Sequence, residues 1–369
     1  MNALSLTGVS IRALSVAFPP TVRTNDDVRA RAPALTAAVE AKHAAQVWRQ
    51  EGRGAADDPF SQAMAPYLSD PFRGTRERRV LAEGETFYPL ILRAAREALD
   101  AAGWRGDQVG VLLSSGFVPQ SLGVGDGAFL ARDLGVRGPA WNYESACSGS
   151  VAGVQLAAAL VSSGQFDSAL VVVGCNYSQN ISDEDTVGWT CGDGAAALLL
   201  TRDEPGRGVL GVHSITTSET CGQIWYDFAT DRAPRPGSYL RLRAGIRSGK
   251  SLQDMSQTAL RTCVDGALSS AGVRLEDVDF FVFNTPLAWY ADFCARALGI
   301  PAEKTIDTYP LYANTGPVLM PTNLFHAARE RRIRNGDLVL CFSIGSVSTA
   351  GAVVMRWGDV ALGPAPTRA

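Results

Sequence analysis

The chain has 369 residues, of which 46% are hydrophobic and 19% are charged, and its formal net charge is −3 at pH 7. This composition can bury a substantial core, and the slightly acidic balance excludes nucleic-acid binding by bulk positive charge. No apolar stretch reaches the roughly 18 residues that a membrane-spanning helix needs, and the first residues lack the pattern of a signal peptide. We therefore expect a cytoplasmic globular protein without membrane or nucleic-acid partners.

The seven cysteines and three histidines are scattered along the chain, without a Cys-x-x-Cys pair. An odd number of cysteines in this arrangement indicates neither a disulfide framework nor a zinc site. We expect no bound metal and no resident cofactor. Because free cysteine is among the most buried residue types, simple packing accounts for six of the cysteines, and Cys147 alone calls for another explanation.

Short apolar runs predict the strands of the protein, at 109–113, 169–173, 280–283 and 338–342. Continuous runs of this kind are typical of strands that helices cover on both faces. The stretches 151–163 and 321–332 have the length and pattern of helices, so a layered α/β protein with its sheets inside is expected. Residues 26–70 interrupt this order with Ala-rich helical sequence, and we interpret them as a lid or peripheral insertion.

The two halves of the chain repeat each other in order. Ala98-Leu99 and Ala102-Gly103 return 169 positions later as Ala267-Leu268 and Ala271-Gly272, and the pattern around Cys147 returns 167 positions later around Asn314. Two weaker matches follow in the same order. Ordered matches argue for a duplicated unit, and we predict two similar α/β halves, at 1–205 and 206–369.

Cys147 lies where a strand gives way to a helix, between the small residues Ala146 and Ser148. The positive end of a helix dipole and nearby N–H groups favour a thiolate, so we expect the pKa of Cys147 to be lowered and the residue to be a nucleophile. Its N–H could contribute to an oxyanion hole. Because duplicated halves face each other, Cys147 and Asn314 should approach a common centre.

Taken together, several segments resemble the thiolase-fold condensing enzymes, and most of all β-ketoacyl-acyl carrier protein synthase III. The resemblance covers nearly the whole chain. It implies a five-layered αβαβα fold, a homodimer joined through the strand at 169–173, and acyl transfer from coenzyme A or an acyl carrier protein through acyl-Cys147. The segments that carry it are Val22-Arg23-Thr24-Asn25, Gly74-Thr75-Arg76-Glu77-Arg78, Ser145-Ala146-Cys147-Ser148-Gly149, Gly192-Asp193-Gly194-Ala195, Ala313-Asn314-Thr315-Gly316 and Gly345-Ser346-Val347-Ser348-Thr349-Ala350-Gly351.

Two positions in the expected active site depart from the family pattern. Asn284 stands where the resemblance places a catalytic histidine, and the usual glycine-rich loop reads Gly345 to Ser348. None of the three histidines is an obvious substitute. An amide can donate a hydrogen bond to an oxyanion but cannot exchange a proton near neutral pH as imidazole does. We therefore name Cys147, Asn284, Asn314 and Ser348 as candidate catalytic residues.

The binding candidates are weaker. Arg247 and Lys250 belong to the densest basic stretch, which suits a phosphopantetheine phosphate or an acidic carrier protein, although such stretches are often only solvated surface. The resemblance also places Lys250 near a tunnel mouth, Arg296 on a carrier-docking helix and Trp289 at a position that is often basic. The segment before Gly74 lacks a tryptophan that could stack on adenine, which favours carrier-protein delivery over free coenzyme A.

Three functions remain open from the sequence. The first is an acyltransferase of specialised, polyketide-type metabolism that passes the acyl group to a small-molecule acceptor. The second is decarboxylative condensation with a malonyl-type thioester, which the departures at Asn284 and the glycine-rich loop disfavour. The third is a silent partner of an active paralogue, which the presence of Cys147 disfavours.

Overall fold

A computed structural model of the chain describes residues 8–50, 58–182, 184–229, 240–245, 248–345 and 348–367, without the side chains of 43–50 and 248–251. Its main sheet has the strand order β11-β12-β13-β8-β1-β7-β6-β4-β5, with β14 beside β1. The strands of the first half are β1 (Val9–Ala17), β4 (Val111–Gly116), β5 (Ala140–Asn142), β6 (Ser168–Asn176) and β7 (Asp193–Arg202). Those of the second half are β8 (Gly208–Thr216), β11 (Phe280–Phe283), β12 (Leu338–Ile344), β13 (Thr349–Arg356) and β14 (Ala361–Leu362).

The two ends of this sheet share one topology. In the first half, β1 pairs antiparallel with β7 and β7 with β6, and the pairs β6–β4 and β4–β5 are parallel. In the second half, β8 pairs antiparallel with β13 and β13 with β12, the pair β12–β11 is parallel, and Phe281 bridges Thr305 in parallel. The halves meet where Val9 of β1 pairs with Gly208 of β8. The two halves therefore repeat the same strand order and strand directions, in agreement with the repeat in the sequence.

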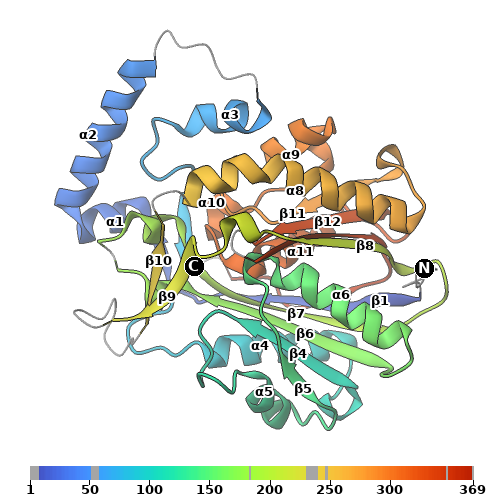
Figure 1. Cartoon of the computed structure of the whole chain (residues 1–369). Helices are drawn as coiled ribbons and strands as arrows, with labels where there is room; N and C mark the ends of the chain where they lie inside the picture. Colours follow the sequence, from blue (N-terminus) through green and yellow to red (C-terminus); the bar gives the residue numbers. More distant parts are fainter. Residues whose placement is uncertain are drawn as a thin grey trace.

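Helices cover the sheet in three layers (Figure 1). The helices α4 (Tyr88–Ala102) and α5 (Gly127–Leu134) lie on the outer face of the first half, and α8 (Ser248–Ala271) and α9 (Tyr290–Leu298) lie on that of the second. Between the halves lie α6 (Gly149–Ser162) and α11 (Leu319–Arg329), which contact strands of both. Each helix layer has its own apolar cluster. The predicted αβαβα fold is therefore confirmed.

The continuous apolar runs follow from this burial on both faces. All nine residues of β6 are buried. Val171 and Val173 face the central cluster, whereas Leu170 and Val172 face the cluster under α4. Because side chains alternate along a strand, a strand between two helix layers needs apolar residues at every position.

Two expectations about the strands need correction. The run predicted to begin at Val109 becomes a strand at Val111, because Val109 ends a 3-10 turn, η2 (Gly106–Gln108). The run at 169–173 was assigned to a dimer-forming edge, but β6 is paired on both sides, with β4 and with β7. The edge strand of this half is β5.

The expected helical insertion consists of α1 (Asn25–Arg31), α2 (Pro33–Gln50), α3 (Pro59–Met64) and η1 (Ala65–Tyr67). Leu35 and Val39 of α2 pack against a small cluster that includes Phe72 and Trp189. The insertion is thus anchored to the body of the protein by its first helices. No helix in the described part of the chain is long and apolar enough to cross a membrane.

Shorter elements complete the structure. The strands β2 (Val22–Thr24) and β3 (Glu77–Arg79) pair with each other, as do β9 (Ile224–Phe228) and β10 (Leu240–Ala244). The remaining helical turns are η3 (Ala146–Ser148), α7 (Tyr177–Asn180), η4 (Thr186–Thr190), η5 (Ser218–Thr220), η6 (Leu275–Asp277), η7 (Ala302–Lys304), α10 (Tyr309–Tyr312) and η8 (Gly316–Val318).

Candidate active site

Cys147 is presented by a strained turn. After β5 the chain enters η3, where Ala146 has a positive φ of 47°, and α6 then begins at Gly149. The N–H of Ala146 donates to Oε1 of Glu144 at 2.6 Å. A non-glycine residue in the left-handed region persists only where its surroundings hold it. The small side chain of Ala146 and its hydrogen bond to Glu144 therefore set the direction of Cys147.

Asn314 lies on the equivalent turn of the second half. Ala313 also has a positive φ, of 57°, and η8 then leads into α11. The N–H of Asn314 donates to the carbonyl of Thr190 at 2.8 Å, and its Oδ1 accepts the N–H of Gly316 at 2.9 Å. The oxygen of the amide is thus used locally, whereas Nδ2 has no acceptor among the described residues.

The two turns are in contact. A Cβ placed on Gly149 would lie 3.2 Å from the Cβ of Pro317, and η3 packs on η8. The strained alanines thus precede Cys147 and Asn314 at the same point of each half, next to the interface of the halves. The predicted convergence of Cys147 and Asn314 agrees with this packing.

The expected thiolate character of Cys147 is wrong for the isolated chain. Burial, with a smaller contribution from the negative charge of Glu144, raises the pKa of the Cys147 thiol to about 11. A hydrogen bond with Tyr177 acts in the opposite direction. The prediction considered the start of α6 alone, but η3 intervenes before the helix begins, and desolvation disfavours the charged form more strongly than the helix favours it.

Tyr177 is a site residue that the sequence analysis missed. It begins α7 directly after β6, and its Oη lies 3.8 Å from Sγ of Cys147. The ring is 6% exposed and stacks on Phe117, with 5.2 Å between the ring centroids. No motif pointed to Tyr177, because a tyrosine after a buried strand is usually a core residue.

Asn284 follows β11 directly, as expected, and is completely buried. Its Oδ1 accepts the N–H of Ile344 at 2.9 Å, and its Nδ2 donates to the carbonyl of Ile344 at 3.3 Å. Both polar atoms of the side chain are therefore engaged by the end of β12. Asn284 ties β11 to the start of the Gly345 loop.

The Gly345 loop lies against the turn of Cys147, and Thr349, the residue after the loop, contacts that turn. Oγ1 of Thr349 lies 2.6 Å from Oγ of Ser148 and also contacts Oγ of Ser145. A Cβ on Gly345 would lie 2.8 Å from the carbonyl oxygen of Ser145, so this position accommodates only glycine.

Within the described residues, Ser348 makes its hydrogen bonds through its backbone. Its N–H donates to the carbonyl of Gly345 at 3.1 Å, and its carbonyl accepts the N–H of Thr217 at 2.8 Å. The neighbouring hydroxyl of Thr349, which sequence reasoning did not single out, makes the contacts with the nucleophile turn. Ser346 and Val347 lie outside the described residues.

The structure describes the side chains of two of the four predicted binding residues, Trp289 and Arg296. Trp289 is 5% exposed and packs against Phe60 and Tyr67, at centroid distances of 6.3 and 5.7 Å, so it has no free face for a ligand. Arg296 is on the surface of α9, in an ion pair with Asp292 at 2.8 Å. Arg247 and the side chain of Lys250 lie outside the described residues.

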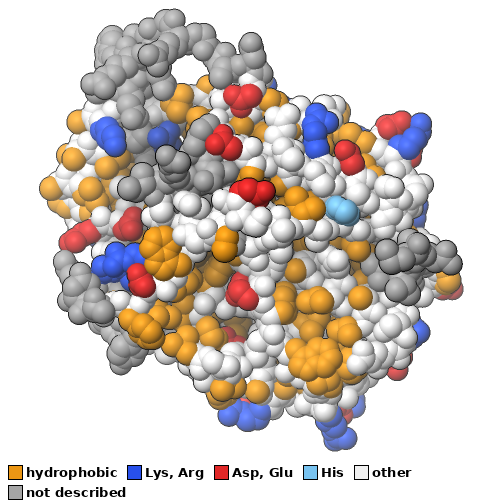
Figure 2. Space-filling model, in the orientation of Figure 1, with side chains coloured by type: hydrophobic (Ala, Val, Ile, Leu, Met, Phe, Trp, Pro, Cys, Tyr) orange, Lys and Arg blue, Asp and Glu red, His pale blue; other side chains and the backbone are white. Residues whose placement is uncertain are grey.

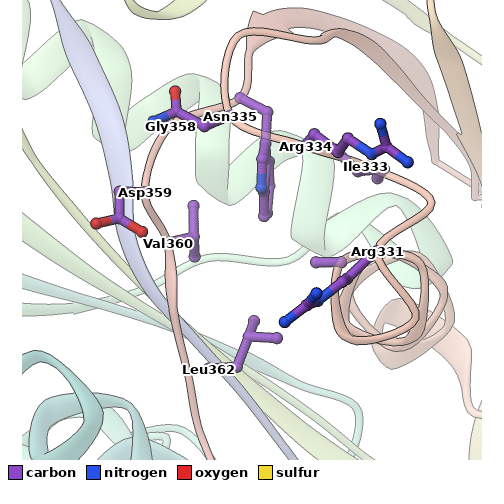
Figure 3. Close-up of a pocket in the computed structure, with 10 residues that line it drawn as sticks. Arg331, Ile333, Arg334, Asn335, Gly358, Asp359, Val360 and Leu362 are labelled. Atoms are coloured by element: carbon purple, nitrogen blue, oxygen red, sulfur yellow. The ribbon is translucent and has the colours of Figure 1, made fainter.

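The pocket in Figure 3 lies apart from these candidates. It has a volume of about 470 Å³ and is lined by the end of α11, the loop after it and the segment before β14. The guanidinium group of Arg331 points towards Leu362, and that of Arg334 points away. None of the predicted site residues lines this pocket.

The other cysteines and the histidines have different surroundings. Cys175, Cys191, Cys263, Cys294 and Cys341 are buried as expected, but Cys221 is exposed, so packing does not account for it. His326 bonds to the hydroxyl of Tyr312 at 3.1 Å, and His213 faces Gly266 of α8. Neither histidine contacts Cys147, and His43 has no described side chain. Within the described residues, no group of three or more His, Cys, Asp or Glu side chains could hold a metal ion.

This arrangement is that of an acyltransferase of the thiolase-like fold. The family model of 3-oxoacyl-[acyl-carrier-protein] synthase III matches residues 142–218, and the model of its C-terminal part matches residues 268–357. The chain is 31% identical over 290 residues to the β-ketoacyl-[acyl-carrier-protein] synthase III of Acidiphilium cryptum, covering 77% of this chain and 88% of the relative. The Rhizobium meliloti enzyme of the same name is 30% identical over 293 residues, with the same coverage. The chain therefore belongs to the β-ketoacyl-[acyl-carrier-protein] synthase III family.

Solved structures agree on the fold. The 3-oxoacyl-(acyl carrier protein) synthase III of Pseudomonas aeruginosa has a TM-score of 0.77 at 21% identity, covering 95% of this chain and 99% of that one. A variant of OleA from Xanthomonas campestris has a TM-score of 0.76 at 19% identity, covering 96% and 100%. Both structures therefore share the fold of this chain over nearly its whole length.

Proposed function

We propose that the chain forms an acyl thioester on Cys147 and passes the acyl group to a second substrate, in specialised metabolism of the polyketide type. The observation that carries this proposal is the placement of Cys147 on a strained turn against the equivalent turn of Asn314. Strain at such a position is characteristic of functional sites. The persistence of the thiol argues against the alternative of a silent partner subunit.

In the first half-reaction, Sγ of Cys147 attacks the carbonyl carbon of the donor thioester. A C–S bond forms to Cys147, the C–S bond to the donor thiol breaks, and the proton of Cys147 leaves with the donor thiol. In the second half-reaction, the acceptor attacks the acyl carbon, the C–S bond to Cys147 breaks, and Cys147 takes up the proton that the acceptor loses. Nδ2 of Asn314, whose Oδ1 is engaged by the N–H of Gly316, is our candidate donor to negative charge on an oxygen atom at this centre.

The donor is expected to be a phosphopantetheine thioester of an acyl carrier protein, with acyl-coenzyme A as the alternative, and no resident cofactor is required. The names of the relatives support a carrier protein. Arg296 on the surface of α9, together with Arg247 and Lys250, remains our candidate contact for it. The buried Trp289 is not retained as a contact.

The second candidate function is decarboxylative condensation with a malonyl-type thioester, and membership of the synthase III family favours it. This reaction develops an enolate that needs hydrogen-bond donors. The expectation that Asn284 replaces a histidine weakens the candidate, because the amide of Asn284 is engaged by Ile344 and leaves Asn314 without its expected partner donor.

Intact-protein mass spectrometry tests both functions. The Cys221→Ser protein is incubated with a panel of acyl thioesters of coenzyme A and carrier protein, because Cys221 is the exposed thiol that could be labelled without catalysis. We expect a mass increase of one acyl group that disappears in Cys147→Ala and persists in Cys263→Ala. Labelling that survives Cys147→Ala would move the chemistry to another residue. Subsequent addition of malonyl thioester or of amine and alcohol acceptors then separates condensation from simple transfer.

We further propose a homodimer formed along the edge strand β5. Trp141 of this strand is 43% exposed, and Leu122 and Val124 on the preceding loop are each 57% exposed. Figure 2 shows hydrophobic side chains gathered on the face of the molecule that carries α6 and β5. An unpaired edge next to exposed apolar side chains favours pairing with a second copy.

A further inference from the structure

Tyr177 and Tyr226 belong to an aromatic cluster beside Cys147 and have no part in the reaction described above. Tyr177 contacts Cys147, and Tyr226 belongs to the same aromatic cluster through Phe117. The cluster closes one side of the site, at the junction of β6 and the β9–β10 hairpin.

Tyr177 is held rigidly. Its ring stacks on Phe117 at an interplanar angle of 23°. A Cβ on Gly316 would lie 2.5 Å from the Phe117 ring, so this ring is packed directly against the turn that carries Asn314. The hydroxyl of Tyr177 is therefore fixed relative to both functional turns, and Cys147 is its hydrogen-bond partner among the described residues.

Tyr226 presents a buried hydroxyl without a partner. Its Oη is inaccessible to solvent and has no hydrogen-bond partner among the described residues. Buried hydroxyl groups are normally paired, and an unpaired one is unfavourable for the folded state. The Tyr226 ring lies 6.3 Å from that of Phe117, which in turn stacks on Tyr177, so the unpaired hydroxyl belongs to the aromatic cluster beside Cys147.

The charges of the titratable groups around Cys147 do not stabilise its thiolate, which therefore requires hydrogen-bond donors. Among the described residues, the titratable neighbours whose charge affects Cys147, or is affected by it, are Glu144, Cys175, Cys191, Tyr177 and Tyr226, and none of these can carry a positive charge. Because none of these side chains is cationic, the side chains around Cys147 can stabilise its thiolate only by hydrogen bonds. The Asn284 amide is engaged by Ile344 and cannot serve without breaking those bonds.

We propose that Tyr177 and Tyr226 are catalytic hydrogen-bond donors of this enzyme: Tyr177 donates to the sulfur of Cys147, and Tyr226 donates to the carbonyl oxygen of the substrate thioester. The role of Tyr226 rests on the proposed function, whereas that of Tyr177 does not.

Both phenols keep their protons throughout. Burial raises the pKa of Tyr177 and of Tyr226 well above the ordinary value for tyrosine, so each is a donor and not a base. The proton of Cys147 leaves with the donor thiol, as in the balanced step above. Each phenol stabilises negative charge while that charge is present, on the thiolate before attack and on the carbonyl oxygen during it.

The test for Tyr177 is the rate of Cys147 alkylation by iodoacetamide between pH 7 and 9, in the Cys221→Ser protein. Tyr177→Phe keeps the ring and removes the hydroxyl. We expect about a tenfold lower rate at each pH, equivalent to about one pKa unit of the thiol. The matched control is Tyr290→Phe, which removes a buried hydroxyl that bonds to Ser256 and should leave the rate unchanged. Equal rates in Tyr177→Phe and its parent would overturn the role of Tyr177.

Tyr226 is tested by the rate of acylation at saturating acyl thioester. Tyr226→Phe should lower this rate by about 10²-fold, the effect of losing one oxyanion donor, and leave iodoacetamide alkylation unchanged. A loss of less than twofold in acylation would overturn its role. Alkylation needs no acyl donor, so failure of the proposed function and failure of the Tyr177 assignment give different results. If Tyr177→Phe does not fold, 3-fluorotyrosine at position 177, a stronger donor, should raise the alkylation rate, and an unchanged rate would contradict the proposal.

Discussion

Asn284 and Ile344, sixty positions apart in the sequence, are joined by a pair of hydrogen bonds between the side-chain amide of one and the backbone of the other. The pair connects the end of β11 to the end of β12, one residue before the Gly345 loop that packs on the turn of Cys147. The side chain of Asn284, at a position expected to contact substrate, thus fixes the ends of two strands next to the site.

Replacement of Asn284 by Ala should therefore affect stability as well as activity. The N–H and carbonyl of Ile344 would lose their partners in a buried location, which costs about 1–3 kcal/mol. We expect the free energy of unfolding in urea to fall by this amount and the second half-reaction to slow because the Gly345 loop loses its anchor, while acylation of Cys147 continues. Asn335→Ala, at an exposed position, is the control. An unchanged urea midpoint would show that the two hydrogen bonds between Asn284 and Ile344 do not contribute to stability.

Replacement of Asn284 by His is the complementary experiment. If the surrounding site still suits condensation, Asn284→His should increase malonyl-thioester decarboxylation above that of the parent protein, measured as released carbon dioxide. Undetectable decarboxylation in this variant, alongside persistent acyl transfer in the parent, would favour the acyltransferase function over condensation.

The reactivity of Cys147 should depend steeply on pH. Because burial raises the pKa of its thiol to about 11, the thiolate fraction grows about tenfold per pH unit throughout the neutral range. The rate of iodoacetamide alkylation in the Cys221→Ser background should accordingly rise tenfold from pH 7 to 8 and again from 8 to 9. A plateau below pH 8 would indicate a thiol of ordinary or lowered pKa.

Ionisation of the buried Asp307 carboxyl should make the protein less stable as the pH rises. Burial raises the pKa of Asp307 to about 7 from an ordinary value near 3.8, although the N–H of Tyr309 and the hydroxyl of Thr285 donate to it. Between these values the native state binds more protons than the unfolded state, so the free energy of unfolding falls from about pH 4 to 7 and then levels off. The expected change is about 4 kcal/mol. Asp307→Asn should flatten this slope, whereas Asp265→Asn, at an exposed position on α8, should retain it.

Arg78 should be a major determinant of stability. Its side chain is completely buried, where the guanidinium donates to the carbonyls of Trp189 and Arg23 and to Oδ1 of Asn25. Arg78→Met would leave these acceptors unpaired, and we expect a loss of about 3 kcal/mol or more in the free energy of unfolding. Arg76→Met, at an exposed position two residues earlier, should change it by less than about 0.5 kcal/mol. Similar unfolding curves for the two variants would contradict this assignment.

The proposed dimer can be tested at β5. Light scattering of the parent should give about twice the 39.1 kDa of one chain at micromolar concentration. Trp141→Asp places a charge on the edge strand and should shift the protein towards the monomer, whereas Phe228→Asp, at an exposed position on β9, should not. A monomeric parent would exclude the homodimer.

The fold and the position of Cys147, the proposed nucleophile, follow from the sequence. Continuous apolar runs predict strands buried on both faces, and the ordered repeat predicts two halves in which Cys147 and Asn314 occupy equivalent turns. These features follow from local patterns that recur along the chain, and each strand or turn bears its own signal. The motifs around Asn25 and Arg78 likewise proved to be one structural unit, joined by hydrogen bonds.

The surroundings of Cys147, by contrast, depend on the tertiary structure. The raised pKa of Cys147 depends on how completely neighbouring segments exclude water, and the partner of Asn284 lies on another strand. The approach of Tyr177, the burial of Trp289 and the identity of the edge strand depend in the same way on contacts between distant residues. A local sequence pattern predicts which face of a strand or helix a residue lies on. The desolvation of a side chain and its hydrogen-bond partners depend instead on the packing of the whole protein.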